Sequence, residues 1–370
     1  MSIYSARLGE ISEIWHRTVA RFGFIVPILV QIFKMERIRP VISKINKSLK
    51  ASVAVAITAG SFATAAAAED FRMLASWDSS YPIVPKVADV FAEMVSEASG
   101  GESSIAMTGP EAVPPFEQLQ PVAAGVFDML FTSGAYHSNE IAVGMVTDAI
   151  QADPAARRDS GVWDAVDAAY QEIGLKLIAL PTLPNGYNVF LRDPIGESCD
   201  FAGLKIRGSA TYTSLIQSLG GQPVVLPPDE IYSALEKGVV DGAAWPVIGA
   251  LDYGWYEVAK YFLRPAFGTA TYMILMNLDT WNGLDEAEQA LLLEQGEALE
   301  VRSIDTLADV AAAEQTALEE NGMEATEMCG DAAATMEHDW AEGVWALGIE
   351  KGGATVEALK ATVDNAGINF

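Results

Sequence analysis

The 370-residue sequence lacks the short motifs that mark most enzyme classes. It has no HExxH, CxxC, GxSxG, Walker or GxGxxG motif, so metalloprotease, thiol-redox, serine-hydrolase, nucleotide-hydrolase and dinucleotide-binding activities each lack their usual signature. Histidine is scarce as well, and only His137 and His338 lie beyond residue 68. A histidine-rich metal site or a Ser-His-Asp triad therefore has few residues to draw on, and we expect no catalytic residue, no metal and no cofactor.

Positively charged residues are also scarce from Glu69 onward. Residues 1–68 contain nine of the 23 lysines and arginines but three of the 50 acidic residues, which leaves 14 basic and 47 acidic residues from Glu69 onward. So acidic a surface repels nucleic acid and anionic lipid, and we expect neither as a partner. An anionic ligand would need a concentrated local cation, which makes each arginine a candidate for binding it.

Cysteine is limited to Cys199 and Cys329. They are too far apart in sequence, and too unaccompanied by other ligands, to predict a metal site. An oxidising compartment would allow them to form a disulfide. Two unpaired thiols are the alternative, because a chain of this length can bury a large core without a covalent link.

The first 68 residues have the pattern of a targeting segment. Three lysines between residues 44 and 50 precede the apolar run Ala51–Phe62, and the small residues Ala63–Ala68 follow. This is the order of a secretory signal peptide, with cleavage near Ala66 or Ala68. We therefore expect the mature chain to be periplasmic.

A membrane anchor is the alternative for the same segment. A spanning helix needs about 20 apolar residues, and the apolar run here is shorter and lacks stop-transfer charges. We expect no direct membrane insertion of the mature chain. Residues 1–34 fit no signal pattern, and we expect Met35 to be the true start.

Strand-like and helix-like segments alternate through the mature chain, which predicts an α/β fold with covering helices. A long helix over Asp285–Asn321 would measure about 50 Å and could bridge two lobes. The expected strands are Phe71–Ser76, Ser104–Met107, Val126–Phe131 and Leu175–Leu180, and the expected helices are Ile83–Ala98, Phe116–Ala124, Gly161–Ile173, Ala332–Leu347 and Ala354–Asn365.

The stretch from Asp200 to Pro246 has the clearest alternation. Its predicted strands are Leu204–Arg207, Pro223–Leu226 and Val239–Trp245, and its helices begin after Ser209 and Asp229 as capping residues. Ligands of open α/β sheets bind beyond the carboxyl ends of strands. Arg207 and Trp245 both lie at such ends.

Aromatic residues recur where predicted strands end. They are Trp77, Tyr81, Tyr136, His137 and Trp245. Such positions line a cleft, although ordinary core packing is the alternative for each of them. For Arg207, a bidentate contact with a ligand carboxylate competes with a salt bridge to a neighbouring acid.

The segment GLKIR, followed by a helix, GG-P and EIYSALEKGVVDGAAWP, resembles the periplasmic solute-binding subunits of TRAP transporters, the DctP-type family. FEQLQPVAAGVFDMLF and LDEAEQALLLEQGEAL resemble two further parts of that family, and the likeness covers residues 69–370. It implies a two-lobed periplasmic binding protein fold (type II-like) with a long bridging helix. It also implies an organic-acid ligand, which is passed to the small and large subunits of an ion-driven membrane permease.

The resemblance also implies site residues. It makes Arg207 the partner of the ligand carboxylate and aligns Asn188, in NGYNVFLR, with a second family position that is often arginine. Trp245 stands where many sialic-acid-type members carry asparagine. Together with Trp77 and Tyr136 it suggests a monocarboxylate with an apolar or aromatic body, and Tyr81 and Tyr187 complete the candidate pocket.

The expected lobes are residues 69–185 plus 271–310 and residues 186–270 plus 311–370. Closure of the two lobes on a ligand would be a hinge motion. Two other functions remain open from the sequence. One is an exported carbohydrate-active enzyme that uses its acids and tryptophans, and the other is a ligand-sensing domain of the same fold.

Overall fold

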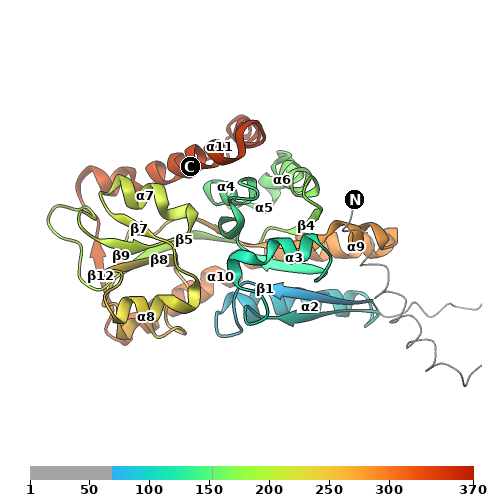
Figure 1. Ribbon diagram of the computed structural model, residues 1–370, viewed down its shortest axis with the longest axis horizontal. Helices are drawn as coiled ribbons and strands as arrows, with labels where there is room; N and C mark the ends of the chain where they lie inside the picture. The colour runs from blue at the N-terminus through green and yellow to red at the C-terminus, as the bar shows by residue number, and fades with distance from the viewer. Residues whose placement is uncertain (1–68, 152) are drawn as a thin grey trace, which may run out of the picture. The chain divides into compact units, whose positions relative to one another are not determined.

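Two mixed β-sheets form the framework of the protein in the computed structural model, which describes residues 69–151 and 153–370 (Figure 1). The predicted targeting segment 1–68 and the expected start at Met35 lie outside the described residues. In the described part of the chain, no helix is both long and apolar enough to cross a membrane.

The first sheet has the strand order β2-β1-β3-β11-β4. The strands β2 and β3 run parallel to β1, whereas β11 runs antiparallel to both β3 and β4. The strands are β1 (Glu69–Ala75), β2 (Ser103–Thr108), β3 (Met129–Thr132), β4 (Leu175–Ala179) and β11 (Met273–Asn277).

The second sheet has the order β12-β9-β5-β8-β6-β7, and β10 also pairs with β5. The parallel neighbours β6 and β8 bring their carboxyl ends to the same edge of the sheet. The strands are β5 (Thr182–Leu191), β6 (Lys205–Arg207), β7 (Gln222–Val224), β8 (Gly242–Pro246), β9 (Tyr261–Arg264), β10 (Phe267–Thr271) and β12 (Glu324–Glu327).

Short helices connect the strands of each sheet. Those beside the first sheet are η1 (Val84–Ala88), α2 (Asp89–Ala98), η2 (Pro115–Glu117), α3 (Leu119–Ala123), η3 (Gly134–His137), α4 (Val143–Val146), η4 (Thr147–Ala149), α5 (Pro154–Asp159), α6 (Val162–Gln171) and α9 (Leu278–Gly283). Those beside the second are η5 (Ala210–Tyr212), α7 (Thr213–Ser218), η6 (Pro228–Glu230), α8 (Ile231–Glu236) and η7 (Trp255–Glu257).

Two long helices, α10 (Glu286–Glu320) and α11 (Gly330–Ala366), each contact strands or helices of both halves of the structure. The predicted long helix is confirmed: Asp285 caps α10 by accepting the backbone N–H groups of Ala287 and Glu288, and α10 packs against β4 and β5. In Figure 1, α11 runs along α7 and on toward α4 and α6, with a kink at Gly353. The lobe boundaries given above remain a prediction.

Some predicted element ends are wrong. The strand expected from Val126 begins only at Met129, because residues 126–128 form a bend in which Val126 is 55% exposed. Ser209 stands at the start of η5 without a side-chain capping bond, and Asp229 lies inside η6 rather than capping it.

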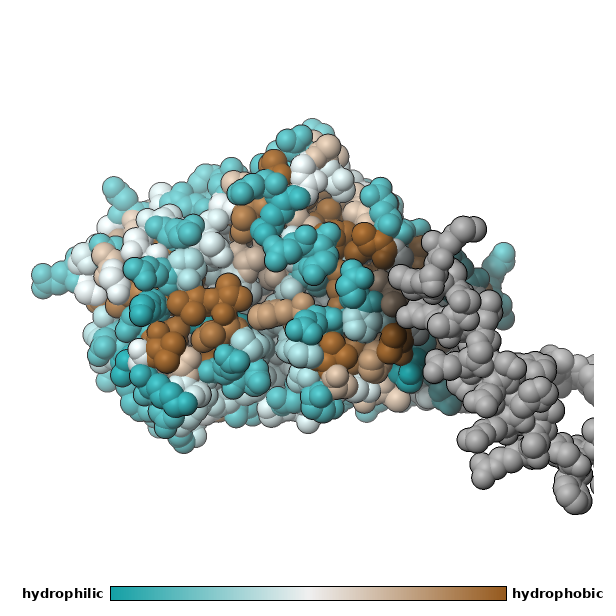
Figure 2. Space-filling view, in the orientation of Figure 1, coloured by the Kyte–Doolittle hydropathy of each residue, from teal (hydrophilic) through white to brown (hydrophobic). Residues whose placement is uncertain are grey.

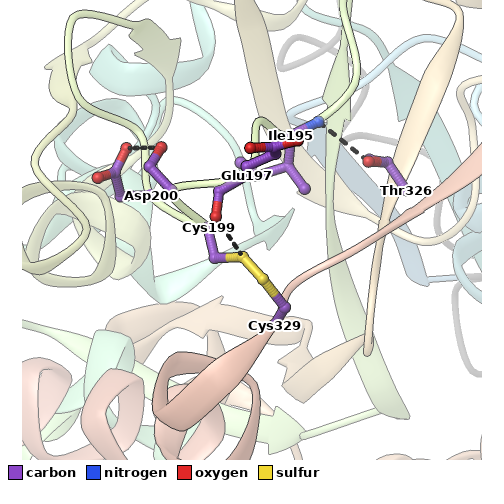
Figure 3. Close-up of a disulfide and its surroundings, with 7 residues drawn as sticks. Ile195, Glu197, Cys199, Asp200, Thr326 and Cys329 are labelled. Carbon is purple, nitrogen blue, oxygen red and sulfur yellow. Dashed lines mark hydrogen bonds between the residues drawn. A yellow bond between two sulfur atoms is a disulfide. The ribbon is translucent and has the colours of Figure 1, made fainter.

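The two cysteines form a disulfide (Figure 3), which decides between the alternatives left open by the sequence. Their Cα atoms are 5.5 Å apart although 130 residues separate them in the sequence. The bond links the loop after β5 to the start of α11. Close to it, the Ile195 N–H donates to Thr326 Oγ1 at 3.0 Å.

Candidate functional site

Arg207 ends β6 and is only 1% exposed. Its Nε and Nη2 donate to the Leu226 carbonyl at 3.0 and 2.8 Å, and its Nη1 donates to the Ala244 carbonyl at 3.2 Å. In the described part of the chain no carboxylate forms an ion pair with it, so the salt-bridge alternative for Arg207 is wrong. Burial lowers the pKa of this guanidinium. The structure thus holds a buried cation that only neutral groups solvate.

Aromatic rings surround this cation and form, with it, what we call the aromatic pocket. The Arg207 guanidinium lies 5.0 Å from the centre of the Trp245 ring. The side chains pack closely and leave a cavity of about 20 Å³ between them. The aromatic lining residues are Trp77, Tyr81, Tyr136, Tyr187, Tyr212, Trp245 and Tyr272.

Both sheets contribute to the aromatic pocket. Trp77 follows β1 of the first sheet, and its Nε1 donates to the Tyr136 hydroxyl at 3.0 Å. Tyr81 packs against Trp245 of the second sheet, with ring centres 5.5 Å apart. The pocket therefore lies between elements of the two sheets, and its walls would separate if the sheets moved apart.

Six of the seven predicted site residues line this one pocket: Arg207, Trp245, Trp77, Tyr136, Tyr81 and Tyr187. Asn188 does not. Side chains alternate between the two faces of a strand, and on β5 it is Tyr187 that faces the pocket, while Asn188 lines a different cavity against α10.

His137 is the other strand-end residue that the structure separates from the pocket. It is buried in the core, where its Nε2 lies 2.5 Å from the Tyr170 hydroxyl, and burial lowers its pKa to about 3. Sequence reasoning missed Tyr212 and Tyr272. Tyr272 directly follows β10, so the rule that selected the other aromatic residues at strand ends would also have found it.

Asp148 joins elements on either side of the pocket. Its carboxylate, 1% exposed, accepts the Thr271 N–H at 3.0 Å and the Thr211 hydroxyl at 2.9 Å. The hydroxyl of Tyr187, a pocket residue, is a third donor. Burial raises the pKa of Asp148 to about 7, although these hydrogen bonds and the positive charge of Arg157 act to lower it.

The pocket has a single formal charge. Among the described residues that line it, Arg207 alone is charged, and the other polar lining groups are hydroxyls, two indoles and backbone. No group of three or more metal-ligating side chains gathers anywhere in residues 69–151 and 153–370. The site thus offers an anion one cation, several hydroxyl groups and flat apolar walls.

A neighbouring cavity is acidic. It shares Trp77 with the aromatic pocket, and its lining includes Asp78, Glu111, Asp229 and Glu230. Figure 2 shows that one face of the molecule is largely hydrophilic, with hydrophobic residues gathered in patches. The attraction for an anion is therefore local to Arg207 rather than a property of the surface.

Comparison with known proteins identifies the family. Residues 74–343 match the family model of bacterial extracellular solute-binding protein, family 7, called DctP. The chain belongs to this family. The predicted resemblance is confirmed.

The relatives of this family-7 protein include two whose names state what they bind. The ectoine-binding periplasmic protein TeaA of Halomonas elongata is 31% identical over 35% of this chain and 38% of its own length. A monocarboxylate 2-oxoacid-binding periplasmic protein of Nostoc is 28% identical over 60% of this chain and 63% of its own length. The chain thus matches less than two thirds of the length of either relative. Both are named as binding proteins rather than enzymes.

Solved structures confirm the two-lobed α/β fold. A TRAP periplasmic solute-binding protein from Desulfovibrio salexigens, with bound orotic acid, matches with a TM-score of 0.72 at 20% identity, covering 80% of this chain and 98% of that one. An extracytoplasmic solute receptor of Bordetella pertussis that binds pyroglutamic acid matches with a TM-score of 0.70 at 18% identity, covering 80% of this chain and all of the other.

Proposed function

We propose that this family-7 protein is the periplasmic receptor of a TRAP transporter and binds an organic acid with one carboxylate in the aromatic pocket. It delivers this ligand to the small and large subunits of a membrane permease. The observation that carries the proposal is Arg207, a fully buried guanidinium without a carboxylate partner. An uncompensated buried charge is costly, and a ligand carboxylate would compensate it through two parallel hydrogen bonds.

The charge of the pocket supports a monocarboxylate over a dicarboxylate. One carboxylate neutralises Arg207, whereas a second would lie among aromatic rings without a cation. The hydroxyls of Tyr136 and Tyr212 could bind an oxo or hydroxyl group of the ligand, and the rings of Trp77 and Trp245 would cover its flat apolar faces. The name of the Nostoc relative, which binds monocarboxylate 2-oxoacids, is consistent with this class.

Export fits the same function. The disulfide between Cys199 and Cys329 needs an oxidising compartment such as the periplasm. We infer that an N-terminal signal peptide directs the chain there, as the order of charged, apolar and small residues in 44–68 predicts. Ligand release to the permease would follow from a hinge motion that separates the two walls of the pocket.

Thermal unfolding with a ligand panel tests the proposal. The panel contains 2-oxo acids, 2-hydroxy acids, aromatic monocarboxylates, their amides and matched dicarboxylates. A true ligand at a hundredfold excess over its Kd adds about 2.7 kcal/mol to the free energy of unfolding. We expect monocarboxylates to shift the melting temperature, and their amides and the dicarboxylates to shift it much less.

The replacement Arg207→Met tests the role of the cation. It should weaken binding of the monocarboxylate by about 2–5 kcal/mol, as loss of one partner of a buried charge pair does. The control is Arg302→Met, because Arg302 is an exposed arginine on α10. Equal affinity of the Arg207→Met variant and the wild type would contradict the assignment, and a panel without any shift would contradict the function.

A further inference from the structure

A second cavity lies behind the aromatic pocket, between β5, β9 and the C-terminal half of α10. We call it the α10 cavity. It measures about 260 Å³, and its lining includes Asn188, Phe190, Phe262, Arg264 and Ala311. Because Tyr187 faces the aromatic pocket and Asn188 the α10 cavity, the two spaces lie on opposite faces of β5.

Asn188 presents an unused hydrogen-bond donor to the α10 cavity. Its side chain is 3% exposed, and its Oδ1 accepts the N–H of the next residue, Val189, at 2.8 Å. Its Nδ2 donates to no other residue in the described part of the chain. Buried amide groups are normally hydrogen-bonded on both atoms. The Nδ2 group is therefore available to an acceptor, water or ligand, that occupies the cavity.

Arg264 and Asn188 both line the α10 cavity, from the neighbouring strands β9 and β5. The antiparallel register of β5 and β9 pairs Phe190 with Phe262 and Leu191 with Tyr261. Asn188 lies two residues before Phe190 and Arg264 two residues after Phe262, so both follow the alternation that turns these two rings toward the cavity. Both side chains can therefore contact a ligand in this one cavity.

The Arg264 guanidinium is available for a ligand. Its Nη2 donates to Gln315 Oε1 at 2.7 Å and its Nη1 to the Leu263 carbonyl at 3.2 Å. Within residues 69–151 and 153–370 no carboxylate pairs with it at 4.0 Å or less. Glu319 and Glu327 act on it only from a distance. It is the one charged side chain among the described residues that line the cavity.

Apart from Asn185 and Gln315, the rest of the lining is apolar, and most of its side chains on the α10 side are small. Ala308, Ala311 and Ala312 leave the space open, while Phe190 and Phe262 cover the sheet side. We propose that the α10 cavity is a second binding site, for a small monocarboxylate with a compact hydrocarbon body. The ligand carboxylate accepts hydrogen bonds from Asn188 Nδ2 and Arg264, and its hydrocarbon part packs against the alanines.

Titration with pivalate, followed through amide chemical shifts of the isotope-labelled protein, tests this site. The titration uses the Arg207→Met variant, so that binding in the aromatic pocket does not contribute. We expect saturable shifts of the Asn188 side-chain amide and of the backbone amides of Ala308 and Ala311. Pivalamide, which has the same shape without the charge, should bind about tenfold more weakly, a difference of about 1.4 kcal/mol.

Three replacements separate this site from unspecific binding. Ala311→Leu fills the cavity and should abolish the shifts, Arg264→Gln should weaken binding about tenfold, and Glu319→Gln should strengthen it by removing a distant negative charge. Because Arg264 is partly exposed, Arg264→Gln keeps the test valid if Ala311→Leu does not fold. The absence of saturable shifts at these residues, or shifts that both Ala311→Leu and Arg264→Gln leave unchanged, would overturn the proposal.

Discussion

Replacing Asp148 by asparagine should remove a pH dependence of stability that the buried carboxylate causes. Burial raises the pKa of Asp148 from 3.8 to about 7, so between these values the folded protein holds a proton that the unfolded chain has lost. In a pH range where the folded state binds more protons than the unfolded state, the free energy of unfolding falls as the pH rises. The free energy of unfolding therefore decreases as the pH rises toward 7, and it levels off above that value.

The size of the effect follows from the two pKa values. Integrating the difference in bound protons from about pH 5.5 to about pH 8.5 gives a loss of about 2 kcal/mol for this one group. For a folded part of roughly 300 residues, this corresponds to a fall of about 3 °C in Tm. The asparagine variant cannot titrate, so its stability should lack this component.

Urea denaturation of the wild type and Asp148→Asn across this pH range measures the component as the difference between the two proteins. Glu314, whose pKa burial also raises to about 7, is present in both and cancels in the difference. Asp159→Asn, which removes an exposed acid from α5, is the control. A difference that stays constant within about 0.5 kcal/mol over this range would refute the reasoning.

Two other features give predictions of stability. The disulfide closes a loop of 130 residues, so Cys199→Ser with Cys329→Ser should cost about 5 kcal/mol, and reductant should destabilise the wild type but not this variant. The Glu300 carboxylate, 1% exposed, accepts from Arg158 Nε at 2.7 Å, and Glu300→Gln should cost about 3–5 kcal/mol in urea denaturation. The control is Glu297→Gln, because the exposed Glu297 carboxylate also lies near Arg158, 3.9 Å from its Nη1, and its replacement should change the stability little. Equal losses of stability for both variants would contradict the argument.

Elements with strong periodicity or a strong end signal could be predicted from the sequence. The long helix was predicted over Asp285–Asn321 because its apolar positions repeat at helical spacing, and α10 begins at the capping residue Asp285. The ends of short elements are predicted less accurately. The apolar run from Val126 matches a strand, but a bend that exposes Val126 delays β3 until Met129. Apolar character alone did not show where pairing with a neighbouring strand begins.

The disulfide could not be decided from the sequence. Cys199 and Cys329 meet because β12 pairs with β9, which brings the start of α11 beside the loop that follows β5. That proximity depends on strand pairing across more than a hundred residues, and no local pattern contains it. The absence of an acid beside Arg207 could not be predicted from the sequence either, because composition does not show which of 47 acidic residues approaches a single arginine.

Asn188 shows how one residue of register decides the chemistry of a site. Family resemblance located the right segment of β5, but neighbouring residues of a strand point to opposite faces, so an alignment shifted by one position exchanges the two. Tyr187, hydrogen-bonded to Asp148, faces the aromatic pocket and contributes no charge, while Asn188 lines the α10 cavity, as Arg264 does. The aromatic pocket therefore keeps a single cation, whichever residue a relative carries in line with Asn188. For this reason the count of ligand carboxylates should follow from Arg207 alone.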